Sequence, residues 1–219
     1  MKLGELKIET LMLIFPSISI DVDTESENGV ELNDALADLK ADPNYCDYLS
    51  AMTGAINRCF TNLESKGVLP TESIELARNR FTERGGKLGV NLSDVTDGYL
   101  QYIAYYDKNG YKTRCDFTRE GSTVLCEDEG NGVYVFVVVP SIPRIKNITG
   151  ASYIISLPDR VTSLMPYFVK SEVIRADDES EANSARALYE QGISELASTL
   201  LSEQYGYQGN VNSEFSIRW

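Results

Sequence analysis

The chain contains no histidine among its 219 residues. Histidine is the commonest general base and metal ligand in proteins, so Ser-His-Asp and Cys-His catalysis cannot occur within this chain. A metal site would need cysteine and carboxylate ligands, yet Cys46, Cys59, Cys115 and Cys126 form no Cys-x-x-Cys pair. We expect reduced, half-buried thiols, of which Cys115 and Cys126 could face each other on neighbouring strands. The sequence predicts no catalytic residues, no metal site and no cofactor, and hence no enzyme.

Three short segments partly resemble known ligand-binding motifs, but none of them matches its motif. The glycine-rich segment 85–89 lacks the Walker spacing and a preceding buried strand, so a hairpin turn is expected. Carboxylates alternate in segment 21–27 but depart from the EF-hand pattern, which favours a solvated acidic loop. The acidic run 177–181 places a carboxylate three residues before a glutamate, which is typical of a helix N-cap with a capping box.

The charge balance bears on partners. There are 33 acidic and 20 basic residues, which gives a formal net charge of −13. Binding to nucleic acid needs clustered lysine and arginine, so gripping of DNA or RNA is not expected. Two interpretations remain open: simple solubility, or a surface past which DNA moves without adhering. No apolar run reaches the roughly 20 residues that cross a bilayer, and the first residues do not resemble a secretory signal, so we expect a soluble protein with no membrane partner.

Helical periodicity dominates both ends of the chain. Apolar residues recur at intervals of three and four in 2–15 and 44–66, and again from 157 to about 204. Pro166 lies inside the first part of the last region, where we expect a kink. Between the first two helices, 17–31 reads as an acidic loop and 33–40 as a helical turn or two.

The middle of the chain changes to an alternating, strand-like pattern. Asn109-Gly110 predicts a hairpin between 100–106 and 111–117. A second hairpin is expected around 128–132, between 123–126 and 133–139. The latter segment is apolar at nearly every position and is expected to be buried on both faces.

These patterns predict an α+β fold, in which an antiparallel helical bundle built from both chain ends carries an inserted β-sandwich-like antiparallel sheet. The expected organisation is a bundle from 1–70 and 157–204, a β-rich insertion from 71–156, and an extended C-terminal arm from 205–219. The arm ends in Phe215, Ile217 and Trp219, within a segment rich in glycine and asparagine. Large apolar residues, two of them aromatic, in such a segment favour docking into another subunit, so these three residues are the candidate interface.

The layout resembles the head–tail adaptor, or connector, proteins of tailed bacteriophages, including the tubular tail proteins of short-tailed phages. The resemblance is carried by the N-terminal segment 2–15, by the end of the sheet region at 137–140, and by the stretch 154–200. In that stretch a Leu-Pro-Asp sequence at 157–159 opens a helix, and an Ala-Asp-Asp turn at 176–178 leads to a helix that begins with small residues. The acidic loop and the β-rich insertion match no motif of that family.

The resemblance implies a non-enzymatic virion protein, made in the bacterial host cytoplasm and placed at the head–tail junction. It would form a homo-oligomeric ring, a dodecamer, joining the portal protein to a downstream neck or tail protein, with DNA only as passing cargo. Two other classes stay open as alternatives. One is a tail-associated carbohydrate-active enzyme using paired carboxylates, and the other is a receptor-binding module of the virion.

Overall fold

The computed structural model describes residues 1–18 and 30–206, and the side chains of 1–18 and 32–200 within them. The chain divides into two compact units, Met1–Cys59 with Ile145–Trp219, and Phe60–Arg144. The sequence placed the divisions at 70/71 and 156/157, whereas the contacts divide the chain at 59/60, inside a helix, and at 144/145. The mixed α+β class with antiparallel sheets is confirmed, because one unit is helical and the other carries every strand of the described chain.

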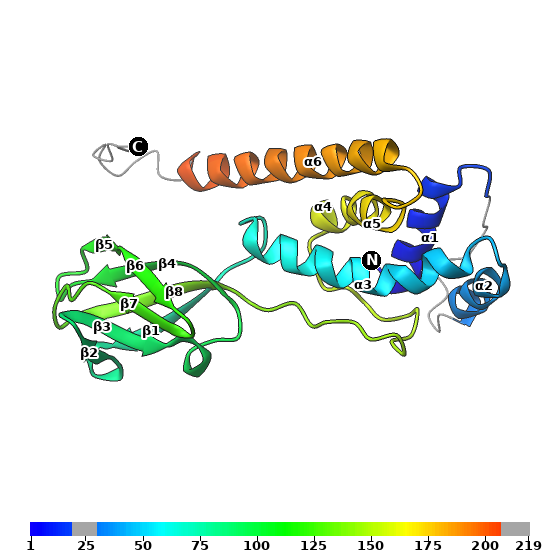
Figure 1. Ribbon diagram of the computed structural model, residues 1–219. Coiled ribbons are helices and arrows are strands. Elements are labelled where there is room, and N and C mark those ends of the chain that lie inside the picture. The colour runs from blue at the N-terminus through cyan, green and yellow to red at the C-terminus, as the bar shows by residue number, and fades with distance from the viewer. Residues whose placement is uncertain (19–29, 207–219) are drawn as a thin grey trace. The chain divides into compact units, whose positions relative to one another are not determined.

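The first three helices are α1 (Leu3–Ile14), α2 (Val30–Ala41) and α3 (Cys46–Ser65) (Figure 1). The backbone N–H of Lys2 donates to Glu5 Oε2 at 2.6 Å and so caps α1. The helix ends before Pro16, as the sequence predicts. Helix α2 is longer than the turn or two expected for 33–40. Its described side chains pack Leu32 against Ile8 and Ala151, with Leu36 and Leu39 at the margin.

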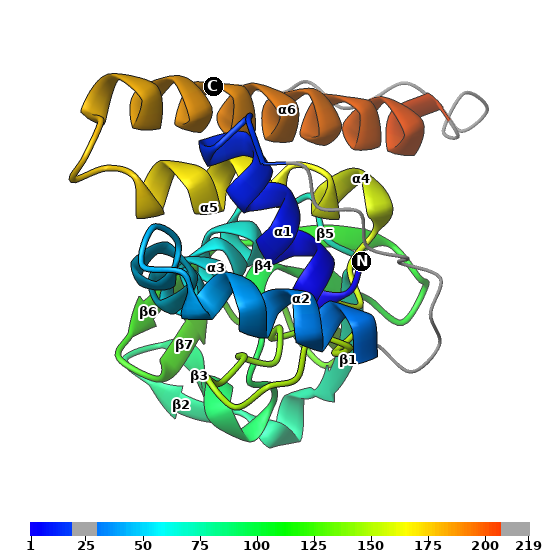
Figure 2. The same cartoon turned by 90° about the vertical axis from the view of Figure 1, so that its right-hand side faces the viewer.

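The C-terminal helices are α4 (Asp159–Thr162), α5 (Met165–Val173) and α6 (Glu179–Gly206). The expected single helix with a kink at Pro166 is wrong. The chain instead breaks after α4, and Pro166 lies in the first turn of α5, where its missing N–H is not needed. Helix α5 packs along α6 (Figure 2).

The N-cap predicted at 177–181 is present, but the reciprocal bond of the capping box is not. Asp178 Oδ1 accepts a hydrogen bond from the Glu181 backbone N–H at 2.8 Å and so caps α6. The Glu181 carboxylate does not return to the cap, because it binds Lys170 Nζ at 2.6 Å. The capping motif is therefore combined with an ion pair to α5.

Elements from both chain ends meet in the helical unit. Residues Lys2 and Ile154 form an isolated antiparallel bridge. Tyr48 Oη in α3 donates to Asp177 Oδ2 at 2.9 Å, and Lys170 Nζ donates to the Leu13 carbonyl at 2.6 Å. These contacts show that both ends build one unit, while the finer prediction of an antiparallel bundle stays a prediction.

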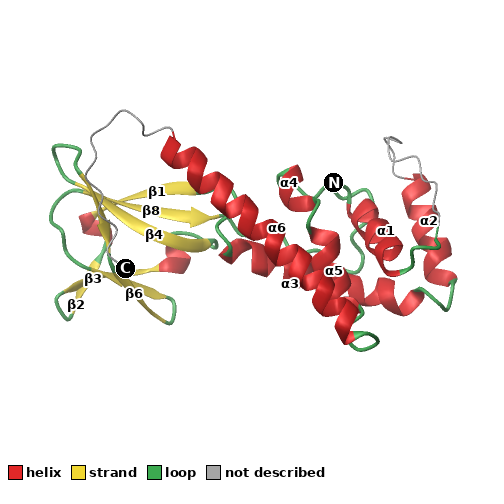
Figure 3. Ribbon diagram, turned by 90° about the horizontal axis from the view of Figure 1, so that it is seen from above, coloured by secondary structure: helices red, strands yellow, loops and turns green. Residues whose placement is uncertain are grey.

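The strands form two four-stranded antiparallel sheets (Figure 3). The first has the order β1-β8-β4-β5 and the second the order β2-β3-β7-β6. The bounds are β1 (Glu72–Ala77), β2 (Thr82–Arg84), β3 (Lys87–Asn91), β4 (Tyr99–Tyr106), β5 (Lys112–Cys115), β6 (Phe117–Glu120), β7 (Thr123–Cys126) and β8 (Val133–Val139).

Side chains from both sheets form one core between them, which includes Ile103, Val124, Tyr134, Phe136 and Val138. This arrangement gives a β-sandwich. The chain moves directly from β5 in one sheet to β6 in the other, with a single residue between them. The two sheets are therefore continuous at that edge.

Two of the three predicted hairpins are confirmed and one is wrong. The turn at Asn109-Gly110 joins β4 to β5 in register, with Tyr106 opposite Lys112. The segment 128–132 is not a hairpin, because β7 pairs with β3 and β6 while β8 pairs with β1 and β4. It carries the chain from one sheet to the other. The glycine-rich segment 85–89 forms the β2–β3 hairpin, as expected.

Candidate functional site

The predicted interface residues Phe215, Ile217 and Trp219 lie outside the described residues, as does most of the acidic loop 17–31. The site must therefore be sought on the described surfaces of each unit.

The outer face of the sheet β1-β8-β4-β5 carries an apolar cluster of its own. Ala104, Val135 and Val137 point away from the sandwich core and pack together, with Tyr102 and Tyr106 against them. This follows from strand alternation, because Tyr134, Phe136 and Val138 of the same strand face the core. The expectation that β8 is buried on both faces is confirmed, since six of its seven residues are buried. Side chains of this face itself, rather than a second sheet, provide the packing that the structure shows there.

Two cations lie over the tyrosines of this outer face. Strand register places Lys112 opposite Tyr106 and Arg114 opposite Ala104. Lys112 Nζ lies 5.6 Å from the centre of the Tyr102 ring and 5.9 Å from that of Tyr106, and Arg114 Cζ lies 5.5 Å from the Tyr102 ring. These are cation–π distances. Within the described part of the chain, neither cation forms an ion pair.

The opposite edge of the same face is acidic. In β1, Ser73 lies opposite Val137 and Glu75 opposite Val135, so both share the outer face. The outer sheet face therefore runs from a carboxylate, across valine and tyrosine, to a lysine and an arginine. We call the residues Glu75, Tyr102, Tyr106, Lys112 and Arg114 the outer sheet patch.

The outer sheet patch has the composition of a protein-docking surface. Tyrosine and arginine are enriched among residues that contribute most to binding energy at interfaces. A tyrosine already held by a cation loses little side-chain entropy on binding. Sequence reasoning treated these tyrosines as the half-covered surface of a sheet and did not consider Lys112 and Arg114. The sequence did contain the necessary information, because the Asn-Gly turn fixes the strand register that places Lys112 and Arg114 over Tyr102 and Tyr106.

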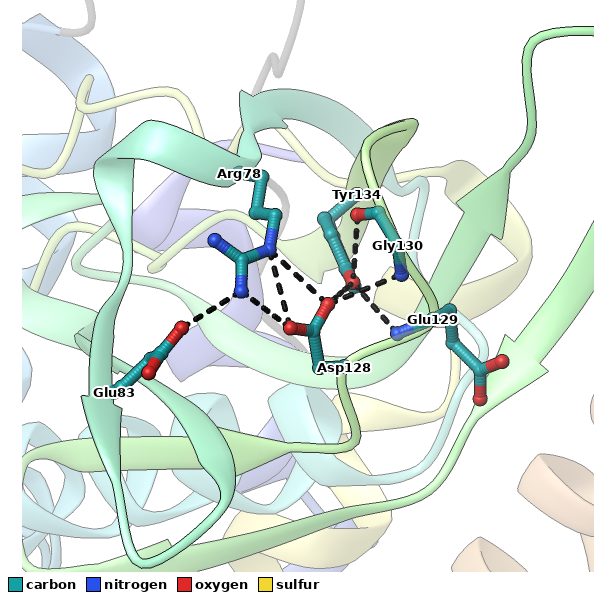
Figure 4. A network of polar contacts seen from close by, with 6 residues as sticks. All are labelled: Arg78, Glu83, Asp128, Glu129, Gly130 and Tyr134. Carbon is teal, nitrogen blue, oxygen red and sulfur yellow. Dashed lines mark hydrogen bonds and ion pairs between the residues drawn. The ribbon is translucent and has the colours of Figure 1, made fainter.

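A second polar cluster binds segment 127–132, which carries the chain from β7 in one sheet to β8 in the other (Figure 4). Arg78 Nε donates to both carboxylate oxygens of Asp128, at 3.1 and 3.2 Å, and its Nη2 donates to Glu83 Oε1 at 2.8 Å. Asp128 Oδ1 also accepts the Gly130 N–H at 3.1 Å, and Tyr134 Oη accepts the Glu129 N–H at 2.9 Å.

The charges of this cluster are mutually satisfied. The Arg78 guanidinium lowers the pKa of the Asp128 carboxyl, and the two carboxylates raise the pKa of Arg78. Burial raises the pKa of Tyr134 to about 12. The lowered pKa of Asp128 is the opposite of what a general acid needs, and we interpret the cluster as a set of contacts that holds segment 127–132 in place.

The cysteines form no disulfide, and three of them, Cys59, Cys115 and Cys126, are buried. Burial raises their pKa values, to about 12 for Cys59 and Cys126 and about 11 for Cys115. A raised pKa removes the thiolate, which is the nucleophilic form. The suggestion that Cys115 and Cys126 occupy neighbouring strands is wrong, because β5 and β7 belong to different sheets. They meet in the core between the sheets.

Among the described residues, no group of three or more cysteine or carboxylate side chains is arranged to hold a metal ion. In the same residues, every helix is too short or too polar to cross a membrane.

Comparison with known proteins gives no family for this chain. No protein-family model matches it, and no curated protein is similar enough to count as a relative.

Proposed function

We propose that the protein is a structural subunit of the head–tail junction of a tailed bacteriophage, an adaptor that joins the portal protein to the next neck or tail component. The family resemblance of 2–15, 137–140 and 154–200 supports the class of protein. The observation that carries the proposal is the outer sheet patch, whose Lys112 and Arg114 lie over tyrosines and form no ion pair within the described residues.

The two units suit two separate docking tasks. The helical unit and the C-terminal arm would bind the portal, and the β-sandwich would bind the downstream component through the outer sheet patch. A ring of identical subunits repeats each contact once per subunit, so a modest patch suffices for a firm joint. The dodecameric state follows from the resemblance alone.

The net charge of −13 agrees with a conduit for DNA. A carboxylate-rich wall repels the phosphate backbone, so DNA would pass without adhering. On this proposal DNA is cargo rather than ligand, and the protein is not an enzyme.

The test uses the portal protein and the downstream neck protein that the proposal expects to be encoded beside this chain. Each is mixed with the full-length protein, and complexes are measured by size-exclusion chromatography with light scattering. We expect the protein alone to be a monomer or weak oligomer, and to form a ring only with portal. Failure to bind portal would overturn the adaptor assignment.

Charge reversal then tests binding to the portal and binding to the downstream component separately. The double variant Lys112→Glu with Arg114→Glu should retain portal binding and lose binding to the downstream component by at least about tenfold, since buried charge pairs of this kind contribute 1.4 kcal/mol or more. Lys108→Glu with Lys146→Glu is the matched control, because both lysines are exposed and lie outside the patch. Equal loss in both double variants would mean that net charge, not the outer sheet patch, governs binding.

The runner-up function is a receptor-binding or carbohydrate-active module of the virion. Binding of the wild-type protein to host cells or their surface polysaccharide, without binding to portal, would favour it.

A further inference from the structure

A small hollow in the helical unit gathers cationic and polar side chains from four segments. Its volume is about 150 Å³. Lys7 comes from α1, Lys40 from the end of α2, and Ser50 and Thr53 from α3. Asn147 enters from the turn that follows Ile145. Leu36 and Leu49 complete the lining, so the hollow is formed by two lysines, three neutral polar residues and two leucines.

The two lysines of this hollow lack a compensating charge among the side chains that the structure describes. Across residues 1–18 and 32–200, neither Lys7 nor Lys40 forms an ion pair or a hydrogen bond with a carboxylate. Lys7 is partly buried, and this burial, together with the charge of Lys40, lowers the pKa of Lys7. A partly buried ammonium beside a second, exposed one destabilises the fold unless an anion joins them.

The rest of the molecule makes this arrangement unusual. The chain has 33 acidic residues to 20 basic ones, so a lysine meets a carboxylate more readily than another lysine. Elsewhere in the described chain, Lys87 pairs with Glu127 and Lys170 with Glu181. Convergence of two lysines, with no carboxylate paired to either among the described side chains, therefore indicates a place kept for an external anion.

We propose that this hollow binds a small tetrahedral oxyanion, phosphate or the phosphate group of a monoester. Lysine is a common phosphate ligand and acts as a point charge without directional preference. The lining residues come from α1, α2, α3 and the turn at Asn147, and none of them is an arginine, whose planar fork selects a carboxylate. The volume admits such an anion with water around it.

Binding would fasten helix α2 to the rest of the helical unit. The described apolar packing of α2 is small, being centred on Leu32 against Ile8 and Ala151. An anion held by Lys7, Lys40 and the Thr53 hydroxyl would connect α1, α2 and α3 directly, whereas the Ser50 hydroxyl already donates to the Cys46 carbonyl at 2.7 Å. The bound anion would therefore stabilise the packing of α2 in the helical unit, a role separate from any docking by the β-sandwich.

The test is titration of the full-length protein with sodium phosphate at pH 7.5 and constant ionic strength. Isothermal calorimetry gives the affinity, and the thermal midpoint reports stabilisation of the folded state by a bound ligand. We expect saturable binding of phosphate, matched by phenyl phosphate if a monoester fits, and much weaker binding of acetate. Binding of acetate as tight as that of phosphate would overturn the assignment to a tetrahedral anion.

Substitution of the lysines locates the site. Lys7→Gln and Lys40→Gln should each weaken phosphate binding at least tenfold. Without phosphate, neither should lower the thermal midpoint, because each removes a repulsion. Lys108→Gln is the matched control, since it changes the net charge equally at an exposed hairpin in the other unit. If Lys7→Gln impairs folding, Lys40→Gln still decides the question, because Lys40 is exposed. Unchanged phosphate affinity in Lys40→Gln, or an equal loss in Lys108→Gln, would overturn the proposal.

Discussion

Lys170 Nζ lies 2.6 Å from Glu181 Oε1 and 2.6 Å from the carbonyl oxygen of Leu13. The lysine side chain is only 11% exposed, whereas that of Glu181 is 49% exposed. One ammonium therefore joins the ends of α1, α5 and α6. The two partners depend on the bond unequally, because the buried cation cannot reach water and the carboxylate can.

This asymmetry predicts a rescue. Glu181→Ala leaves the Lys170 ammonium with the Leu13 carbonyl alone and should lower the free energy of unfolding by about 1–3 kcal/mol. Lys170→Met keeps most of the apolar stem and should restore part of that loss when added to Glu181→Ala. Urea denaturation of the two single variants and the double variant measures the coupling. Glu179→Ala is the matched control, since both glutamates lie in the first turn of α6. A double variant less stable than Glu181→Ala would contradict this account.

Alanine is predicted to be poorly tolerated at two glycines beside the β4–β8 pairing, Gly98 just before β4 and Gly132 just before β8. A Cβ on Gly98 would lie 2.2 Å from the Val139 carbonyl oxygen, and one on Gly132 would lie 2.1 Å from that of Tyr106. Both obstacles are backbone atoms, so relief requires the strand pairing to shift. Gly98→Ala and Gly132→Ala should each cost more than about 2 kcal/mol of stability, measured by thermal or urea denaturation.

The control for these glycines is Gly54→Ala. Gly54 lies on an exposed position of α3 and its added Cβ would meet only the end of the Arg58 side chain, at 3.4 Å. It should stabilise the protein by up to about 1 kcal/mol, because alanine favours the helix. Tolerance of alanine at Gly132 would show that the β4–β8 pairing is looser than described.

Gly132 also shows why one turn could not be predicted from the sequence. Asn131-Gly132 reads as a hairpin signal, but the glycine serves the close approach of Tyr106 in the neighbouring strand. Local alternation shows that β7 and β8 are strands, without showing which strands they pair with. That choice depends on packing of the whole sandwich, and it places β7 and β8 in different sheets. At Asn109-Gly110 the local signal sufficed, because the two strands it joins are each other's partners.

The outer sheet patch, too, could be predicted from the sequence only in part. Once Tyr106 is opposite Lys112, alternation alone places Lys112 and Arg114 on the face of Tyr102. The burial of Val135 and Val137 beneath these side chains required the three-dimensional packing. The hollow of Lys7 and Lys40 gave no sequence signal at all, because its lining comes from segments distant along the chain.

The hydroxyl of Tyr134 is predicted to stabilise the passage between the sheets. It accepts the Glu129 N–H at 2.9 Å, and the Tyr134 side chain is fully buried. Tyr134→Phe leaves that N–H without its acceptor and should cost about 1–2 kcal/mol, measured by urea denaturation. Tyr111→Phe is the control, because Tyr111 is 74% exposed and should change stability by less than about 0.5 kcal/mol. Equal effects at the two positions would mean that the Tyr134 hydroxyl contributes nothing.

Alkaline pH should destabilise the protein through its buried thiols. In the unfolded chain a cysteine loses its proton near pH 9, whereas in the folded protein the pKa is about 12 for Cys59 and Cys126 and about 11 for Cys115. Between those values the folded state holds more protons than the unfolded state. The stabilising contribution of each thiol is therefore complete below about pH 9 and is lost as pH rises toward 11–12, at up to about 1.4 kcal/mol per pH unit for each group.

Urea denaturation under reducing conditions, from pH 7.5 to pH 10.5, measures that slope. Cys126→Ala removes one of the titrating groups and should make the decline above pH 9 shallower, whatever its effect on stability at pH 7.5. Cys46→Ala is the control, because Cys46 lies outside the buried set. Its slope should equal that of the wild type. An unchanged slope in Cys126→Ala would mean that the Cys126 thiol ionises alike in the folded and unfolded states, and that the core between the sheets admits water.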